Sequence, residues 1–518
     1  MKRRIAALFM AAIVAAGALA GCGGSGGNDA GTGSGGNQGS VESDGGNAGG
    51  DNGDVTTIIV EMINYGFDDA DLQMVEDAMN EITVPEIGVR VDFLTVPIGE
   101  MATKLGLMVS GGEDIDLVCA GLLTSPVTLV NEGLLQPITE YINNSPVLSE
   151  KAGELLEACT VNGEIYAYPG ALYAGSGGAL FYDKDMAEEY NIQMPDHVSS
   201  GAELTAILEQ AAQSGMPCYA ISMGDGVNAE RNFGISYEGL GDSVNASYGV
   251  IVDAVNGTEV VNWYETEEYQ DQVKRHREWF QAGYSVPDSI SNGYVTYDSM
   301  AQGQCFSFVG TYSSGTTEAY FGSMTGKNVG RVVIGEPLVD TTGIINTCWG
   351  VASTSTKAAE VVKFVELLYT NEELATLYRY GIEGTHFVRT EGSRVITYPE
   401  GKDPMSVGYG AFIPMFGDES ELPVMAPLTE DYYSTLDSFS IEHARVSKYL
   451  GYSFDPSSVD SKVRAVQSVV AQYGPSLNVG SDDFDTLYPQ FIQALKDAGI
   501  DDIIAENQAQ LDAWLAEQ

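Results

Sequence analysis

The sequence predicts an α/β protein with room for more than one domain. The chain has 518 residues, of which 44% are hydrophobic, and this is enough apolar material for large buried cores. From residue 55 onward, short apolar runs alternate with longer segments whose apolar residues recur at helical spacing. Strands that alternate with helices of about 10–15 residues are typical of parallel βαβ units, and this pattern determines the predicted class.

The first predicted α/β unit begins at residue 55. Its elements are a strand at 57–62, a helix at 69–81, a strand at 89–94, a helix at 100–109 and a strand at 115–119. Ligands of such sheets bind beyond the carboxyl ends of the strands, which here are 64–65 and 120–122. No glycine-rich phosphate-binding motif follows a strand, so the sequence predicts no nucleotide cofactor.

A second set of elements begins near residue 160. A short extended piece is predicted at 163–170. The predicted strands are 179–182, 304–310, 332–334 and 347–352, and the predicted helices are 202–213, 266–282, 358–369, 484–498 and 501–515. Both patterns therefore indicate α/β architecture, with helices at the end of the chain.

The N-terminus has the features of an export signal. Three basic residues, Lys2, Arg3 and Arg4, precede an apolar stretch at 5–20, which is too short to span a membrane. The following Leu-Ala-Gly-Cys resembles a bacterial lipobox, which implies a lipoprotein signal peptide at 1–21 and a lipid, such as palmitate, on Cys22. An ordinary secretory signal with a chance cysteine is the alternative.

Residues 22–54 are predicted to be the lipidated cysteine and a flexible tether. Of the 32 residues after Cys22, 14 are glycine and none is aromatic, so this segment cannot form a core. The sequence thus predicts an exported protein, anchored by lipid to the cell membrane and facing the extracellular or periplasmic side.

The charge balance excludes whole classes of partner. The chain has 73 acidic and 24 basic residues, and removal of the three basic signal residues takes its formal charge from −49 to −52. Such a surface repels phosphate backbones, which excludes nucleic acid, and it offers no polybasic membrane patch.

The remaining cysteines and the histidines suggest no metal or redox chemistry. Five cysteines follow Cys22, in apolar surroundings and without C-x-x-C spacing: Cys119, Cys159, Cys218, Cys305 and Cys348. We expect them to be core thiols, of which an odd number leaves at least one unpaired. The four histidines form no helix-spaced pair, so neither a metal site nor another cofactor is expected.

Several longer motifs resemble one family when their order is considered. They are "GEIYAYPG" leading into "ALFYDKDMAEEYNI", then "MAQGQCFSFVGTY", "TCWGVASTSTKAAEVVKFVELLYTNEELATL" and "YLGYSFDPSSV". Together with the lipobox, they resemble an extracellular solute-binding lipoprotein of an ABC importer. The similarity is to the maltose-binding-protein-like group (family 1 type), in a long branch with a C-terminal extension.

This resemblance implies a two-lobe, periplasmic-binding-protein-like fold with a hinge and a central ligand cleft. It places lobe 1 at 55–168 and 345–380, and lobe 2 at 169–344 and 381–518 with the helical extension. It also implies a monomer that captures a small solute and delivers it to ABC permease subunits. Many relatives have a basic residue near the "YDKD" motif; Phe181 and Tyr182 stand here, so no anionic ligand contact is carried over.

The predicted ligand is a sugar or oligosaccharide, because tyrosine is abundant and basic residues are scarce. Aromatic rings stack on sugar faces while carboxylates accept from hydroxyls. The candidate rings and polar clamps are Tyr65, Tyr173, Tyr312, Trp349, Asp116 and Glu383. The alternatives are core or hinge packing for the rings and solvated or capping roles for the carboxylates.

Three other functions stay open. A peptide or other small-solute receptor of the same fold would need a positive group for a ligand carboxylate. A surface glycoside hydrolase would need two carboxylates about 5–9 Å apart, and chance pairs among 73 acidic residues are no evidence for it. An adhesive lipoprotein would show repeats, and none is seen. We therefore expect a receptor without catalytic residues.

Overall fold

The computed structural model describes residues 55–64, 68–97, 100–122, 124–222, 237–242, 246–286, 296–402, 406–410 and 416–518. The predicted signal peptide, Cys22, the tether and Tyr65 lie outside these ranges. No helix within them is both long and apolar enough to cross a bilayer.

The first lobe is built on a six-stranded sheet with the order β2-β1-β3-β12-β4, in which β7 also pairs with β12. Its strands are β1 (Thr56–Asn64), β2 (Val89–Pro97), β3 (Leu117–Cys119), β4 (Leu135–Gln136), β7 (Ala167–Pro169) and β12 (Cys348–Ala352). β1 runs parallel to β2 and β3, whereas β12 runs antiparallel to its neighbours. The parallel βαβ pattern predicted from the sequence is therefore present, and one strand from far along the chain completes the sheet.

Helices cover this sheet and fill its connections. They are α3 (Asp69–Ile87), α4 (Met101–Gly111), α5 (Pro126–Asn131), α6 (Thr139–Asn143), α7 (Pro146–Ala152), the 3₁₀ helix η3 (Gly153–Cys159), α14 (Ala358–Thr370) and α15 (Glu372–Tyr380). A small hairpin pairs β5 (Thr160–Val161) with β6 (Glu164–Ile165). Helix α3 is longer than predicted because it continues through Pro85 to Gly88, whose left-handed backbone (φ 66°) caps it.

The second lobe contains a five-stranded sheet with the order β16-β11-β8-β10-β9. Its strands are β8 (Ser176–Asp183), β9 (Ile221–Ser222), β10 (Ser307–Ser313), β11 (Val329–Val339) and β16 (Arg445–Val446). The helices around it are α8 (Lys184–Glu189), α9 (Gly201–Gln213), α10 (Glu267–Ala282), α11 (Thr296–Ala301) and α12 (Glu318–Thr325). Gly177 is required in β8, since a Cβ there would lie 2.2 Å from the carbonyl oxygen of Gly335.

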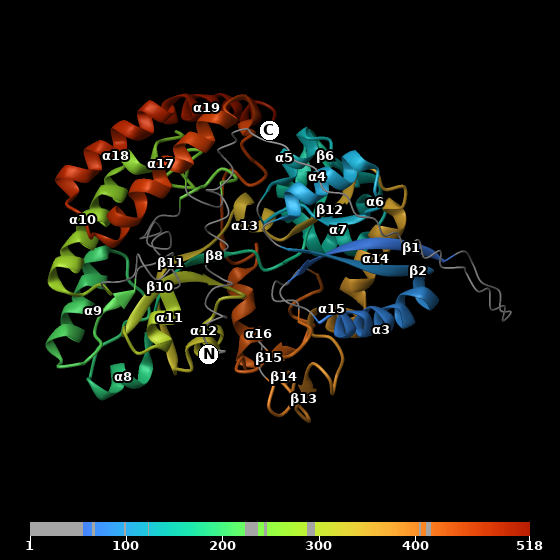
Figure 1. Ribbon diagram of the computed structural model, residues 1–518, viewed down its shortest axis with the longest axis horizontal. Coiled ribbons are helices and arrows are strands. Elements are labelled where there is room, and N and C mark those ends of the chain that lie inside the picture. The colour runs from blue at the N-terminus through green and yellow to red at the C-terminus, as the bar shows by residue number, and fades with distance from the viewer. Residues whose placement is uncertain are drawn as a thin grey trace, which may run out of the picture.

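Three chain crossings connect the lobes, which lie side by side in Figure 1. The first crossing, 170–175, joins β7 to β8; the second, 340–347, contains α13 (Thr341–Ile345) and joins β11 to β12. The third crossing, 426–444, leads through α16 (Asp431–Leu436) and η6 (Asp437–Phe439) to β16. It starts from a three-stranded sheet of β13 (Val388–Arg389), β14 (Val395–Thr397) and β15 (Val424–Met425).

A C-terminal body packs on the outer side of the second lobe, where its helices form an arc (Figure 1). Its elements are η5 (Trp263–Glu265), η7 (Pro456–Ser458), α17 (Asp460–Val479), α18 (Phe484–Ala498) and α19 (Ile500–Leu515). Its core combines residues from 240–273 with residues from 449–511. An internal segment and the chain end thus build one core together.

The lobe boundary after residue 380 differs from the expected division. The resemblance places Tyr409 and Phe416 in lobe 2, yet both are buried in the core of the first lobe. The Tyr409 hydroxyl donates to the carbonyl oxygen of Tyr378 at 2.6 Å. Irregular segments have no periodicity that shows which lobe they return to, so the sequence pattern could not place these two rings.

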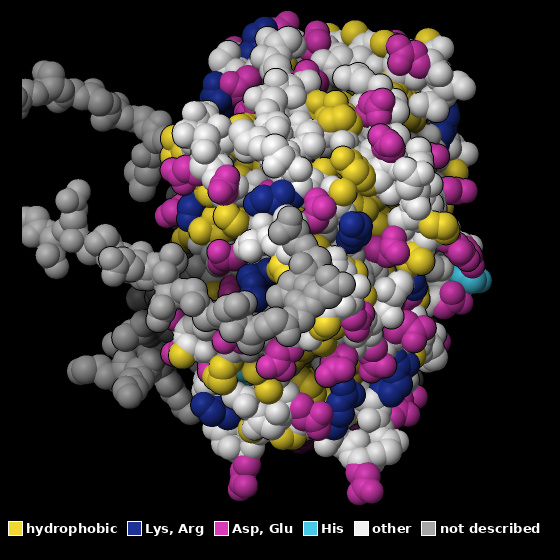
Figure 2. Space-filling model, turned by 90° about the vertical axis from the view of Figure 1, so that its right-hand side faces the viewer, with side chains coloured by type: hydrophobic (Ala, Val, Ile, Leu, Met, Phe, Trp, Pro, Cys, Tyr) yellow, Lys and Arg dark blue, Asp and Glu magenta, His cyan; other side chains and the backbone are white. Residues whose placement is uncertain are grey.

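The surface keeps the acidic character of the composition. Figure 2 shows carboxylates spread over the face of the first lobe, with hydrophobic side chains scattered among them. Lys and Arg side chains lie singly among the carboxylates on this face and form no single basic patch in that view.

Candidate functional site

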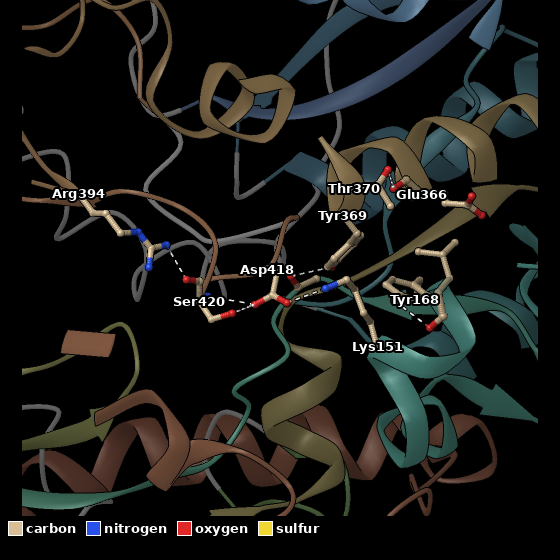
Figure 3. Close-up of polar contacts among 10 residues, drawn as sticks. Lys151, Tyr168, Glu366, Tyr369, Thr370, Arg394, Asp418 and Ser420 are labelled. Atoms are coloured by element: carbon tan, nitrogen blue, oxygen red, sulfur yellow. Dashed lines mark hydrogen bonds and ion pairs between the residues drawn. The ribbon is translucent and has the colours of Figure 1, made fainter. Parts of the chain in front are cut away.

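Polar side chains gather where the crossings leave the first lobe, around residues 418–420 (Figure 3). Lys151 on α7 donates to Asp418 at 2.7 Å, and the Ser420 hydroxyl donates to the other carboxylate oxygen of Asp418 at 2.6 Å. Burial by itself would raise the pKa of Asp418, but the hydrogen bonds from Lys151 and Ser420 outweigh it and hold the pKa below its ordinary value. Asp418 is therefore an ionised anchor that ties this loop to the first lobe.

The neighbouring Glu419 is buried but not satisfied. Its side chain is 2% exposed, and neither carboxylate oxygen has a hydrogen-bond partner among the described residues. Burial raises its pKa, while the nearby charge of Arg379 on α15 and the adjacent Ser314 side chain act in the opposite direction. A buried polar group without a partner costs free energy, which is why such a group at a lobe junction is a candidate for contact with a ligand or water.

Tyr173, on the first crossing, borders both Glu419 and the second lobe. Its half-buried ring packs against the second-lobe core and against the small cluster that includes Tyr432 of α16. The Ser314 hydroxyl, just beyond β10, donates to the Tyr173 carbonyl oxygen at 3.3 Å. Tyrosine rings, carboxylates, a guanidinium and hydroxyls from both lobes therefore form one wall along the crossings, which we call the hinge wall (Tyr173, Ser314, Arg379, 418–420 and Tyr432).

The first crossing is held by a second pair of tyrosines. The Tyr369 hydroxyl lies 3.0 Å from the Pro169 carbonyl oxygen and 3.1 Å from that of Gly170. Its ring meets Tyr168 edge-on, with centroids 5.4 Å apart. These rings fix where the hinge begins, and both lie beside Asp418 and Lys151 in Figure 3.

One buried carboxylate lies near the carboxyl end of β1. Glu61 is 1% exposed and accepts a hydrogen bond from the Cys119 amide at 2.9 Å. Burial raises its pKa to about 7. Since ligands bind beyond this edge of a parallel sheet, Glu61 belongs to the same region as the predicted cleft.

Tyr312 and Trp349, the strongest sequence-based candidates, are both enclosed. Tyr312 is 5% exposed; Arg331 lies over its ring at 4.4 Å from the centroid, and Phe439 meets it edge-on. Trp349 is 1% exposed in the first-lobe core, with its ring centroid 5.1 Å from that of Phe416. Neither ring presents a free face in this conformation, so neither is included in the candidate site.

Asp116 and Glu383 also lie away from the hinge wall. Asp116 precedes β3 at the end opposite the expected ligand edge, and it accepts from the Ile59 amide (2.8 Å) and from Lys357 (3.0 Å). Glu383 is exposed and pairs with Arg389 at 3.3 Å. Only Tyr173 of the described candidates therefore lines the hinge wall, which brings together residues that the sequence analysis did not select.

No local signal could have selected Asp418, Glu419 or Lys151 in advance. Asp418 and Glu419 lie in an irregular acidic stretch whose sequence is typical of a solvent-exposed turn. Lys151, the partner of Asp418, is 267 residues away in the chain. Within the described ranges, no group of three or more His, Cys, Asp or Glu side chains is placed to hold a metal ion.

Comparison with known proteins identifies the family. The family model described as bacterial extracellular solute-binding protein matches residues 78–385, which is more than half of the chain. The chain belongs to this family. A second model, a domain of unknown function (DUF3502), matches residues 448–516, which make up most of the C-terminal body's helices.

Relatives of this solute-binding protein extend over nearly the whole chain. A carbohydrate ABC transporter substrate-binding protein of Streptococcus pneumoniae is 24% identical over 478 residues, which cover 90% of this chain and 92% of the relative. The crystal structure of the N-glycan transport solute-binding protein NgtS, also from S. pneumoniae, has a TM-score of 0.75 at 21% identity. That match covers 89% of this chain and 99% of NgtS.

A more distant solved structure has the same fold. It is a solute-binding protein from Bifidobacterium longum infantis described as binding HMO, with a TM-score of 0.58 at 16% identity, covering 89% of this chain and 99% of that one. The predicted family and the two-lobe α/β fold with a hinge and a central cleft are confirmed by these matches.

Proposed function

We propose that this protein is the substrate-binding receptor of an ABC transporter and captures a sugar or oligosaccharide between its lobes. The observation that carries the proposal is its match to a carbohydrate transporter receptor over 90% of the chain. NgtS, which has the same fold, was also solved with Man1GlcNAc and with Man5GlcNAc. An oligosaccharide ligand is therefore the first to test.

The chemistry of the hinge wall suits a neutral, hydroxyl-rich ligand. Glu419 offers two acceptors without partners, and Arg379 offers donors beside it. Tyr173 adds a ring with a polar edge at the same junction. The two cations here already face carboxylates, Lys151 that of Asp418 and Arg379 that of Glu419, which leaves neither in excess for a peptide carboxylate.

The proposal includes the cellular setting expected from the sequence. The receptor is held at the membrane by lipid on Cys22, faces outward as a monomer, and delivers its ligand unchanged to permease subunits. The extracellular family supports the location, and the relatives' transporter role supports the permease partner.

Binding without turnover tests this function. The mature body would be incubated with Man1GlcNAc and Man5GlcNAc, and with a mixed peptide pool as the matched control. We expect at least one glycan to raise the melting temperature while chromatography recovers it intact. Stabilisation by peptides alone would favour the alternative receptor, and a shortened glycan would indicate a hydrolase.

A further inference from the structure

The domain of unknown function begins with a segment that touches three parts of the molecule. Residues 447–452, which we call the hinge strut, follow β16 and precede α17. The strut is hydrogen-bonded to the end of β11 and to the second crossing that follows it. Its Ser447 amide donates to the carbonyl oxygen of Val339 at 2.9 Å, and its Gly451 amide donates to the Thr341 hydroxyl at 2.9 Å.

Side chains of the strut point into two different cores. Leu450 is 6% exposed and packs in the core that the first lobe shares with the second crossing, which includes Leu155 of η3 and Ile344 of α13. Tyr449 and Tyr452 lie in the core of the C-terminal body, at 0% and 4% exposure. Successive residues of one short segment therefore bury themselves in two separate bodies.

Gly451 also approaches the first lobe closely. Its φ of 94° is a conformation that residues with a Cβ rarely adopt. A Cβ at this position would lie 3.2 Å from the Glu157 carbonyl oxygen of η3. The backbone conformation thus favours glycine, and a Cβ here would fit only if η3 shifted slightly.

The other end of the C-terminal body is attached to the second lobe through α10. Trp279 on α10 donates to the Thr205 hydroxyl of α9 at 2.9 Å. His276, also on α10, lies 2.7 Å from the Asn478 carbonyl oxygen of α17. A continuous chain of buried contacts runs from the second lobe through α10 and α17 to the strut, and from there to the first lobe.

We propose that the C-terminal body is a brace for the hinge, in which the strut sets the pivot about which the lobes close. The three covalent crossings leave the angle between the lobes free to vary. The strut is buried in the first-lobe core through Leu450 and in the C-terminal body through Tyr449 and Tyr452. This restricts the angle between the lobes, because a rotation of the lobes about any other axis would pull Leu450 out of its core. The proposal rests on the family's two-lobe fold and does not depend on which solute is bound.

Leu450→Ala tests the brace, with Leu511→Ala as the matched control. Leu511 on α19 is 0% exposed in the C-terminal body core and is not part of the strut. Hydrogen exchange of the ligand-free protein would be followed in η3 and α13. We expect Leu450→Ala to accelerate exchange in both at least about tenfold, although η3 is distant in sequence. We expect Leu511→Ala to lower the melting temperature and to accelerate exchange in α17–α19 alone.

Gly451→Ala provides a second variant with a different physical basis. It adds one methyl group that presses against η3, so it should also widen the distribution of the radius of gyration in small-angle scattering. The proposal is wrong if hydrogen exchange in η3 is equally fast in Leu450→Ala and Leu511→Ala and the radius of gyration of Gly451→Ala is unchanged. These readouts need no ligand, so a failure of the brace is distinguishable from a failure of the proposed sugar binding.

Discussion

The first-lobe core and the hinge wall each contain a large aromatic ring and a buried carboxylate, but in different states. In the first lobe, Trp349 is 1% exposed and Asp116 is hydrogen-bonded to a backbone amide and a lysine. In the hinge wall, Tyr173 is half-buried and both oxygens of Glu419 lack a described partner. The Trp349 indole nitrogen also lacks a described partner, so the two regions differ in enclosure and not in hydrogen bonding alone. A ring enclosed within one lobe maintains the fold, whereas a half-buried ring beside a carboxylate at the junction has capacity left for a ligand.

The largest expected effect is that of Trp349→Ala. Removing a fully enclosed indole leaves a cavity, so we expect the ligand-free protein to lose about 4 kcal/mol of unfolding free energy, measured in urea. Ligand affinity of the remaining folded protein should be retained. If the variant instead keeps its stability and loses sugar binding, the ring contacts the ligand and our placement is wrong.

Asp116→Ala should have a somewhat smaller cost. The substitution leaves the Ile59 amide and Lys357 without their shared acceptor, and we expect a loss of about 3 kcal/mol. Asp116→Asn is the matched control, since it keeps an acceptor for the amide and should lose less. If the Asp116→Ala protein keeps its stability but binds the glycan more weakly, Asp116 contacts the ligand.

The raised pKa of Glu61 should make the free energy of unfolding depend on pH. Its pKa in the folded protein, about 7, is above its ordinary value of 4.5, so the folded state favours the protonated form. This contribution to stability is complete below pH 4.5 and is lost as the pH rises towards 7. It amounts to about 3 kcal/mol at 1.36 kcal/mol per pH unit. Glu61→Gln should remove this slope from denaturation curves, and an unchanged slope would show that Glu61 is ionised throughout.

The smallest expected change in free energy is that of Glu419→Gln. The amide keeps one acceptor but loses the charge, so we expect affinity for a glycan to fall about tenfold, which is about 1.4 kcal/mol, without loss of apo stability. Isothermal titration would measure the affinity. Ser434→Ala, which removes an exposed hydroxyl that donates to the Asp431 carbonyl within α16 and is not part of the hinge wall, is the matched control. Equal affinities for both variants and the parent would exclude Glu419 from the site.

Local patterns in the sequence were enough for the class and for most elements. The strands before Asn64 and Cys119 and the amphipathic helices α14 and α18 follow from alternation and helical spacing, because those signals depend on residues close in sequence. The order of degenerate motifs was enough for the family, which the family model confirms.

Tertiary structure alone decided which residues form the hinge wall and the strut. Lys151 binds Asp418, and Leu450 shares a core with Leu155, only because segments far apart in the chain lie side by side. The enclosure of Trp349 depends likewise on Phe416, which arrives from an irregular segment without periodicity. Burial and partner choice arise from long-range packing, and a single sequence records residue types but not the contacts they make.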